Sequence, residues 1–269
     1  MSEVVRVVMF SGGVGSWAAA KRVAERHGTD NLVLLFTDTL IEDADLHRFL
    51  DEAAADVGGR LVRITEGRSP WQVFRDEGMI ANTRADLCSR ILKREPADAW
   101  LAEHCDPANT TVYIGIDWTE AHRFDNGEGR GAKNRYARAG WRCKAPLCEP
   151  PYLTKQDLFI ALREAGIRRP RLYDEGFAHN NCGGFCVKAG LGQFAHLLKM
   201  RPALYAEHEA AENEVRAATG WRQTILRDST GGTVKPVTLT AFRERIERGW
   251  QPDLFDIGGC GCFVEDGAP

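Results

Sequence analysis

The first half of the chain alternates short apolar runs with longer stretches in which apolar residues recur every three or four positions. The apolar runs predict strands at residues 4–10, 31–38, 59–65 and 110–115. The longer stretches predict helices at residues 17–27, 41–57, 70–77 and 88–104. Strands that alternate with helices of this length indicate right-handed crossovers. The expected fold class is therefore α/β, with a doubly wound, mostly parallel sheet.

The second half has a different pattern. Residues 124–145 are rich in glycine and charge without a period, which predicts a mobile loop, and residues 146–151 form a proline-rich joint. Thr154 followed by Asp157 marks the start of a helix at 154–166. From Cys182 onward the chain is predicted to be mainly helical. We expect an α/β domain over 1–145 and a helical, cysteine-rich region over 146–269 packed on it.

The overall composition is that of an ordinary globular protein. Of 269 residues, 43% are hydrophobic and 27% are charged, and the net charge of −3 argues against a general nucleic-acid coat. No run of about 18 apolar residues occurs, and the N-terminus leads directly into a strand. We therefore expect no membrane span and no signal peptide, and a cytoplasmic location.

A glycine-rich turn joins the first strand to the first helix, with the sequence Ser11-Gly12-Gly13-Val14-Gly15-Ser16. Glycines let the backbone approach a ligand closely, and the start of a helix carries partial positive charge. The turn therefore suits a phosphate or pyrophosphate. The alternative is an ordinary strand-to-helix turn that binds no ligand, in which the glycines are needed only for the backbone conformation. Neither a Gly-Lys-Ser/Thr ending nor a Gly-x-Gly-x-x-Gly spacing is present.

Polar residues also follow the second and fourth strands, at the same expected edge of the sheet. Asp38 ends the second strand and could bond a ribose, orient a metal with Glu42 or Asp43, or cap the next helix. Glu120 and Arg123 follow the fourth strand one helical turn apart. They are candidates for nucleotide or substrate contacts, or for a simple surface ion pair.

Eight cysteines are many for a cytoplasmic chain, where disulfides are rare. Six of them form close pairs, which suggests metal or redox chemistry: Cys143/Cys148, Cys182/Cys186 and Cys260/Cys262. Two sulfurs that bracket Gly183-Gly184 could turn toward one metal, with further ligands from Cys148, Cys260, Cys262 or His179. The alternative is a set of buried free thiols.

The glycine-rich hexapeptide resembles the PP-loop, Ser-Gly-Gly-x-Asp-Ser, of the ATP pyrophosphatase and sulfonucleotide reductase superfamily, with Gly15 at the position of the aspartate. The whole chain is similar to phage-type phosphoadenosine-phosphosulfate (PAPS)-reductase-like proteins. The resembling stretches are residues 10–16, 36–50, 88–93, 115–123, 146–151, 179–190 and the Gly-Gly-Cys-Gly-Cys-Phe end. This resemblance implies an adenine nucleotide alpha hydrolase-like fold.

The resemblance also implies roles for particular residues. The nucleotide-binding set is Ser11, Gly12, Gly13, Val14, Gly15, Ser16, Phe36, Asp38 and Gly115. The catalytic set is Lys93, Glu120 and Arg123. The metal-binding set, for a zinc ion or an iron–sulfur cluster, is Cys148, Cys182, Cys186, Cys260 and Cys262. ATP or a related adenine nucleotide, with Mg²⁺, is the implied cofactor.

Three functions follow from these expectations. The leading hypothesis is an enzyme that cleaves ATP between the α- and β-phosphates and adenylates an acceptor, with sulfur transfer to nucleic acid as one form. The first alternative is a PAPS or adenylyl-sulfate reductase that uses Cys260 or Cys262 as nucleophile. The second is a nucleotide-binding protein without catalysis, because Gly15 replaces the aspartate. A homodimer is left open.

Overall fold

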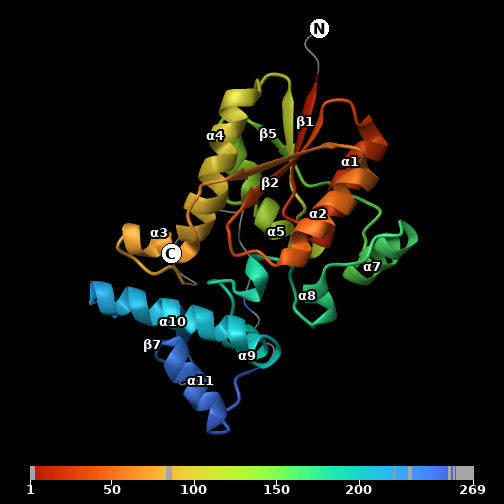
Figure 1. The fold of residues 1–269 in the computed structure, drawn as a ribbon. Coiled ribbons are helices and arrows are strands. Elements are labelled where there is room, and N and C mark those ends of the chain that lie inside the picture. The colour runs from red at the N-terminus through yellow and green to blue at the C-terminus, as the bar shows by residue number, and fades with distance from the viewer. Residues whose placement is uncertain are drawn as a thin grey trace.

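The computed structural model describes residues 4–82, 87–220, 222–229 and 232–253, together with Asp256 and Gly258. Five parallel strands form one sheet in the order β3-β2-β1-β4-β5 (Figure 1). Their bounds are Val5–Met9 (β1), Leu32–Asp38 (β2), Arg60–Thr65 (β3), Thr110–Tyr113 (β4) and Arg142–Lys144 (β5). The predicted parallel α/β fold is confirmed. The order reverses between β1 and β4, so the segments that leave these two strands diverge and open a crevice at that edge.

Helices cover both faces of the sheet (Figure 1). On one face, Val8 and Phe10 pack against α1 (Val14–His27), α2 (Ala44–Val57) and α7 (Lys155–Glu164). On the other face, Val7 and Met9 pack against α4 (Glu95–His104) and α6 (Ala132–Arg138). Successive residues of a strand point to opposite faces, so a strand buried on both faces is apolar throughout. This explains the apolar run at residues 4–10, in which Arg6 is the one polar residue.

The stretch 124–145 is not the continuous loop that its composition suggests. The helix α5 (Ala121–Phe124) ends at its start, α6 follows, and β5 adds a fifth strand to the sheet. Ala132 and Tyr136, one helical turn apart, are fully buried, and the guanidinium of Arg135 pairs with Asp98 at 2.8 Å. A helix of seven residues, such as α6, is too short to produce a recognisable period, and the polar residues around it hide the pattern.

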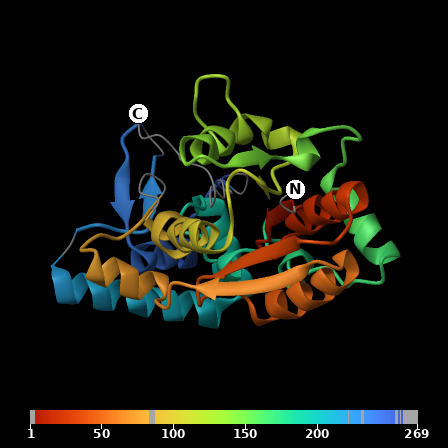
Figure 2. The same ribbon diagram turned by 90° about the horizontal axis from the view of Figure 1, so that it is seen from above.

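The rest of the second half is mainly helical, as expected, with α8 (Arg171–Asp174), α9 (Leu191–Met200), α10 (Pro202–Thr219) and α11 (Leu239–Glu247). An antiparallel hairpin of β6 (Leu226–Asp228) and β7 (Lys235–Val237) was not expected. These helices share an apolar cluster with α3 (Pro70–Asp76), which lies along α10 (Figures 1 and 2). Two of the apolar clusters contain residues from both sides of residue 145. The predicted boundary between two domains at that residue stays a prediction.

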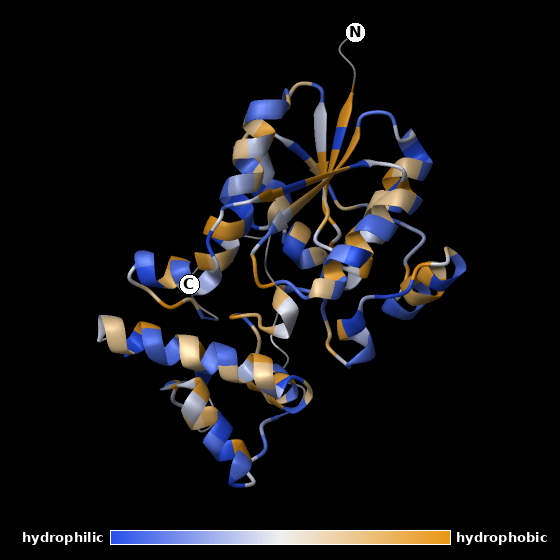
Figure 3. Cartoon of the chain, viewed as in Figure 1, coloured by the Kyte–Doolittle hydropathy of each residue, from blue (hydrophilic) through white to orange (hydrophobic). Residues whose placement is uncertain are grey.

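Figure 3 shows apolar strands at the centre and mixed helix surfaces around them. Within the described ranges, none of the helices combines the length and the apolarity that a bilayer crossing needs.

An ion-pair network joins α2 to the second half. Asp43 caps α2, and its carboxylate accepts hydrogen bonds from the guanidinium groups of Arg171, at 2.8 and 2.9 Å, and Arg201. Burial alone would raise the pKa of Asp43, but these two arginines hold it below its usual value. Arg201 also binds Glu175. The start of α2 is therefore fixed against α8 and the start of α10.

His208 predicts how stability depends on pH. Its ring is 6% exposed, accepts a hydrogen bond from Trp71 Nε1 at 3.0 Å and stacks on Phe185. Burial lowers its pKa to about 4. In the unfolded chain the histidine pKa is near 6.5, so between about pH 6.5 and pH 4 the unfolded chain binds a proton at this position and the folded chain does not. Stability is therefore lost as the pH falls from about 6.5 to about 4, by up to about 3 kcal/mol.

Urea unfolding at pH 7.0 and 4.5 measures this loss. In His208→Gln, whose amide oxygen can still accept from Trp71, the loss of unfolding free energy should be smaller by about 2 kcal/mol. His122→Gln, at an exposed position, is the control and should behave like the parent. An equal loss in the parent and in His208→Gln would contradict the assignment.

Candidate functional site

The segment after β1 turns tightly into α1. Gly12 has a φ of 77°, and a Cβ there would lie 2.8 Å from Leu46 Cγ, so this position requires glycine. The backbone N–H and the hydroxyl of Ser16 both donate to the carbonyl oxygen of Gly13, at 3.1 and 2.8 Å. Gly13 is the N-cap residue of α1 and, as a glycine, supplies no side-chain cap of its own. The positive end of α1 faces the crevice.

The loop lies directly against the segment that leaves β4. A Cβ on Gly115 would lie 2.8 Å from the backbone nitrogen of Ser16, and one on Gly15 would lie 3.0 Å from the carbonyl oxygen of Gly115. In both cases the added Cβ would clash with a backbone atom, and the clash could not be removed by the rotation of a neighbouring side chain. Glycine at both positions is what allows the ends of β1 and β4 to meet this closely.

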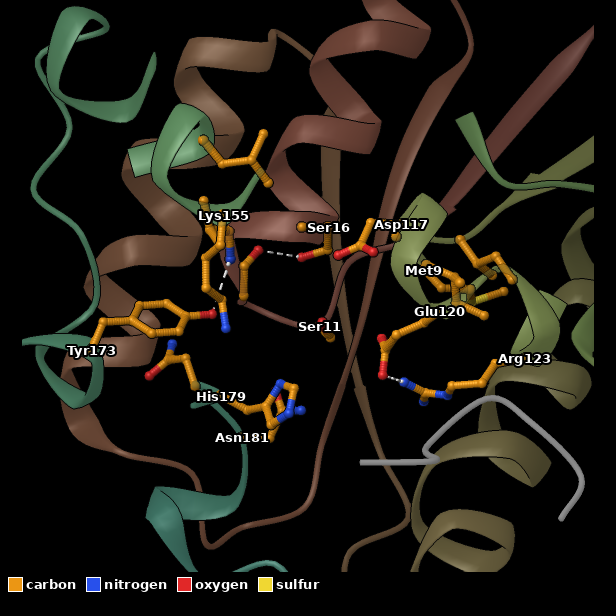
Figure 4. A pocket seen from close by; sticks show the side chains of 18 residues that line it. Met9, Ser11, Ser16, Asp117, Glu120, Arg123, Lys155, Tyr173, His179 and Asn181 are labelled. Atoms are coloured by element: carbon orange, nitrogen blue, oxygen red, sulfur yellow. Dashed lines mark hydrogen bonds and ion pairs between the residues drawn. The ribbon is translucent and has the colours of Figure 1, made fainter. Parts of the chain in front are cut away.

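A pocket opens above this contact (Figure 4). Three parts of the chain line it: the loop after β1, the segment after β4, and a set of side chains from the second half. The predicted residues among them are Ser11, Gly13, Val14, Gly15, Ser16, Gly115, Glu120 and Arg123. The polar residues that sequence reasoning missed are Asp117, Lys155, Tyr173, Asn180 and Asn181, and His179, which was expected only as a metal ligand.

Side chains from the second half hold the loop in place. Asn180 is 1% exposed, and its side-chain amide donates to the carbonyl oxygen of Gly12 at 2.7 Å. The hydroxyl of Tyr173 accepts from the backbone N–H of Val14 at 3.4 Å. Tyr173 lies in the four-residue helix α8 and Asn180 in an irregular segment. Neither is long enough for a hydrophobic period, so the sequence alone carries no signal for their position.

The pocket contains both signs of charge. Arg123 donates to Glu120 at 2.5 Å, and one oxygen of Asp117 accepts from the backbone N–H of Thr119 at 2.8 Å (Figure 4). Lys155, at the start of α7, donates to the carbonyl oxygen of Ala178. Desolvation lowers the pKa of Lys155, against the carboxylates of Asp117 and Glu120, which raise it.

His179 shares this environment. Burial lowers the pKa of its imidazole, and the ammonium of Lys155 lowers it further. His179 is therefore neutral at pH 7 and able to accept a proton. Taken together, the pocket offers the positive end of α1 and two cations to an anion, two carboxylates to a cation, and one neutral imidazole.

Several predicted nucleotide contacts lie outside this pocket. Phe36 is 1% exposed, and its ring packs edge-to-face on His47 beneath α2. Asp38 accepts from the backbone N–H of Leu40 at 2.8 Å and fixes a local turn. Asp43, not Asp38, caps α2. The structure does not bring Phe36 or Asp38 to the glycine loop.

Lys93 also lies elsewhere. Its ammonium pairs with Glu42 at 3.3 Å, and the two side chains are 6% and 1% exposed. Lys93 lines a second, small pocket together with Cys88, Cys182 and Cys186. The structure therefore separates Lys93 from Glu120 and Arg123, the other two residues expected to be catalytic.

The predicted metal ligands are likewise not gathered at one place. Cys182 and Cys186 share the second pocket, whereas the sulfur of Cys148 lies 3.5 Å from the carbonyl oxygens of Ile116 and Asp117, behind the exit of β4. Cys260 and Cys262 fall outside the described residues. Among the residues that the structure describes, no three histidine, cysteine or carboxylate side chains form a group that could hold a metal ion. A zinc ion or iron–sulfur cluster stays a prediction.

No family model matches the chain, and a search of curated proteins finds no match. Among solved structures, the chain is similar to a phosphoadenylyl-sulfate (PAPS) reductase from Candida auris in a phosphate complex. The sequence identity is 16% and the TM-score is 0.43, over 66% of this chain and 79% of that one. It is also similar to an NH3-dependent NAD synthetase from Campylobacter jejuni subsp. jejuni in complex with the nitrate ion. Here the identity is 14% and the TM-score is 0.41, over 82% and 86% of the two chains.

The first of these neighbours is a reductase of the kind that the sequence resembles. At this level of identity and structural overlap, the likeness says nothing about the reaction. The function of this chain is therefore inferred from its pocket.

The contact between Gly115 and Ser16 can be tested by substitution. Gly115→Ala should lower the free energy of unfolding by about 1–3 kcal/mol, because the new methyl group meets backbone at 2.8 Å. Gly13→Ala is the matched control. Its methyl group would meet the Tyr173 hydroxyl at 3.4 Å, an ordinary contact, and should cost less than about 1 kcal/mol. Chemical denaturation of both variants measures the difference, and equal losses would contradict the close contact.

Proposed function

We propose that this protein binds ATP in the pocket at the glycine loop and cleaves it between the α- and β-phosphates, transferring the adenylyl group to an acceptor. One observation carries the proposal. The N-cap residue of α1 is Gly13, which supplies no side-chain hydrogen bond, and this end of the helix lines a pocket that also contains Arg123 and Lys155.

The β- and γ-phosphates are assigned to the loop. Backbone N–H groups at the start of a helix bind phosphate oxygens, and the helix dipole favours their negative charge. Arg123 and Lys155 line the same pocket and supply two positive charges. Charge-assisted hydrogen bonds of this kind are about twice as strong as neutral ones. The site suits the several charges of a triphosphate better than a single small anion.

The carboxylates fit a magnesium ion bound with the nucleotide. Magnesium is typically held by one or two carboxylates and by substrate phosphates, so it does not need a group of three protein ligands, which the described residues do not form. Asp117 and Glu120 line the pocket beside the loop. They would supply oxygen ligands that Gly15 cannot. When bound, Mg²⁺ neutralises charge that develops on the phosphate oxygens.

The reaction follows from this placement. An acceptor oxygen attacks the α-phosphorus, the bond from that phosphorus to the bridging oxygen breaks, and pyrophosphate leaves with the electron pair. The acceptor proton passes to neutral His179, which lines the same pocket. The loop and the cations stabilise the leaving pyrophosphate. That the acceptor is a nucleic acid stays a prediction, and so does the formation of a homodimer.

Nucleotide binding is the first testable step. Gly13→Val should remove ATP binding, because a β-branched side chain at the helix start blocks close approach of phosphate. The fold should persist, since an added Cβ meets the Tyr173 hydroxyl at 3.4 Å and the Ser11 hydroxyl at 3.9 Å, both ordinary contact distances. Isothermal titration with ATP and Mg²⁺ measures binding, and thermal unfolding checks the fold. Unchanged affinity in a folded Gly13→Val variant would rule out this site.

The role of Lys155 has its own matched control. Lys155→Met should weaken ATP binding about tenfold or more, since it removes a charge from the phosphate site. Lys133→Met removes a lysine that pairs with Asp125 at 2.7 Å outside the pocket lining, and it should bind ATP like the parent. Equal affinities of the two variants would exclude Lys155 from the site.

The reaction class is tested by offering ATP and adenylyl-sulfates side by side, with dithiothreitol present and with nucleosides and oligonucleotides as acceptors. Pyrophosphate release from ATP that depends on an acceptor supports adenylation. Sulfite release that depends on Cys260 or Cys262, without pyrophosphate, would establish the reductase alternative. Tight ATP binding without either product would indicate a protein that only binds the nucleotide.

A further inference from the structure

The second pocket brings together three cysteines from distant parts of the sequence. Cys88, Cys182 and Cys186 all line it, and its volume is about 20 Å³. A space of this size holds about one water molecule. None of the three cysteines forms a disulfide in the structure. This group is called the thiol pocket below.

The local backbone explains how two of the thiols reach one place. Cys182, Gly183 and Gly184 have φ values of 52°, 61° and 91°, which fold the segment into a tight turn. The turn is closed by a hydrogen bond from the backbone N–H of Phe185 to the carbonyl oxygen of Cys182 at 2.8 Å. Cys186 follows directly. Cys88 arrives from the helical segment that precedes α4.

Two buried lysines, Lys93 and Lys188, also line the thiol pocket. At three other described cysteines, burial raises the pKa of the thiol: to about 12 for Cys143, to about 11 for Cys148, and above its usual value for Cys105. These three thiols are poorly placed for reaction at pH 7.

We propose that the thiol pocket is a redox-active site in which Cys182 forms a reversible disulfide with Cys186 or Cys88. The oxidant is a small disulfide such as oxidised glutathione. The first thiolate attacks it to give a mixed disulfide and releases one glutathione thiolate. The second cysteine thiolate then attacks the mixed disulfide and releases the other glutathione. In total, the two cysteines lose two protons and two electrons, and the oxidised glutathione is reduced to two thiols.

The position of Cys182 couples this chemistry to the glycine loop. Two residues earlier, Asn180 donates to the carbonyl oxygen of Gly12, and the neighbouring Asn181 lines the first pocket. The backbone N–H of Cys182 donates to the buried carboxylate of Glu42. A disulfide at Cys182 must rotate its side chain and shift this short connection. Oxidation is therefore expected to displace Asn180 and to weaken ATP binding, a consequence that rests on the proposed function.

Disulfide formation itself is tested without any nucleotide. The full-length protein is reduced, treated with oxidised glutathione at pH 7.5, alkylated and digested, and its disulfide-linked peptides are mapped by mass spectrometry. A Cys260→Ser/Cys262→Ser background removes competition from the terminal pair. The expected result is a peptide that links Cys182 to Cys186 or to Cys88, and that disappears on reduction. A protein that forms no such link, or that pairs Cys182 with neither residue, would overturn the proposal.

Matched variants separate the thiol site from its coupling to the nucleotide. Cys182→Ser should abolish the linked peptide, whereas Cys143→Ser, at a buried and less reactive thiol, should retain it. In the parent, oxidation should raise the dissociation constant for ATP about fivefold or more, and in Cys182→Ser it should not change. A mapped disulfide without this shift would overturn the coupling alone. Failure of the reduced protein to bind ATP would instead count against the proposed function, with the mapped disulfide unaffected.

Discussion

The site depends on one close contact between two backbone segments. The loop after β1 and the segment after β4 meet at Gly15, Ser16 and Gly115, where an added Cβ would lie 2.8–3.0 Å from backbone atoms. Parallel strands on either side of a reversal in strand order send their connections apart, which opens a crevice at the carboxyl edge of the sheet. Here the crevice is closed at its base by glycine packed on glycine. The start of α1 is consequently aimed at the space above that base.

Side chains from the second half of the chain bind the glycine loop and line the pocket beside it. Asn180 holds the carbonyl oxygen of Gly12, Tyr173 reaches the backbone of Val14, and Lys155 brings a cation to the pocket wall. The ion pairs of Asp43 with Arg171 and Arg201 tie α2 to α8, which carries Tyr173, and to the start of α10. The loop is therefore fixed from both sides, which reduces the entropy that a bound nucleotide would have to remove.

The sequence was sufficient to predict the sheet and the loop, but not the partners of the loop. Buried parallel strands are apolar throughout and long helices are periodic, so β1, α1 and α2 were recognisable. The seven residues of α6 were too few for a period, and β5, the one strand of the sheet that was not predicted, follows a glycine-rich stretch. Asn180 and Lys155 lie far from Gly12 in sequence, so only the fold shows that Asn180 binds the loop and that Lys155 lines the same pocket. Lys93 was expected to act with Glu120 and Arg123, yet it pairs with Glu42 and lines the thiol pocket, because tertiary packing decides its direction.

The most direct test of the central claim is a crystal structure of the protein with Mg²⁺ and an ATP analogue that carries a methylene group between the α- and β-phosphates. Such an analogue occupies the site without being cleaved. The account predicts the β- and γ-phosphates within hydrogen-bonding distance of the backbone N–H groups between Gly13 and Ser16, with the ammonium of Lys155 beside them. Phosphates bound elsewhere, or a glycine loop that contacts no ligand atom, would contradict it.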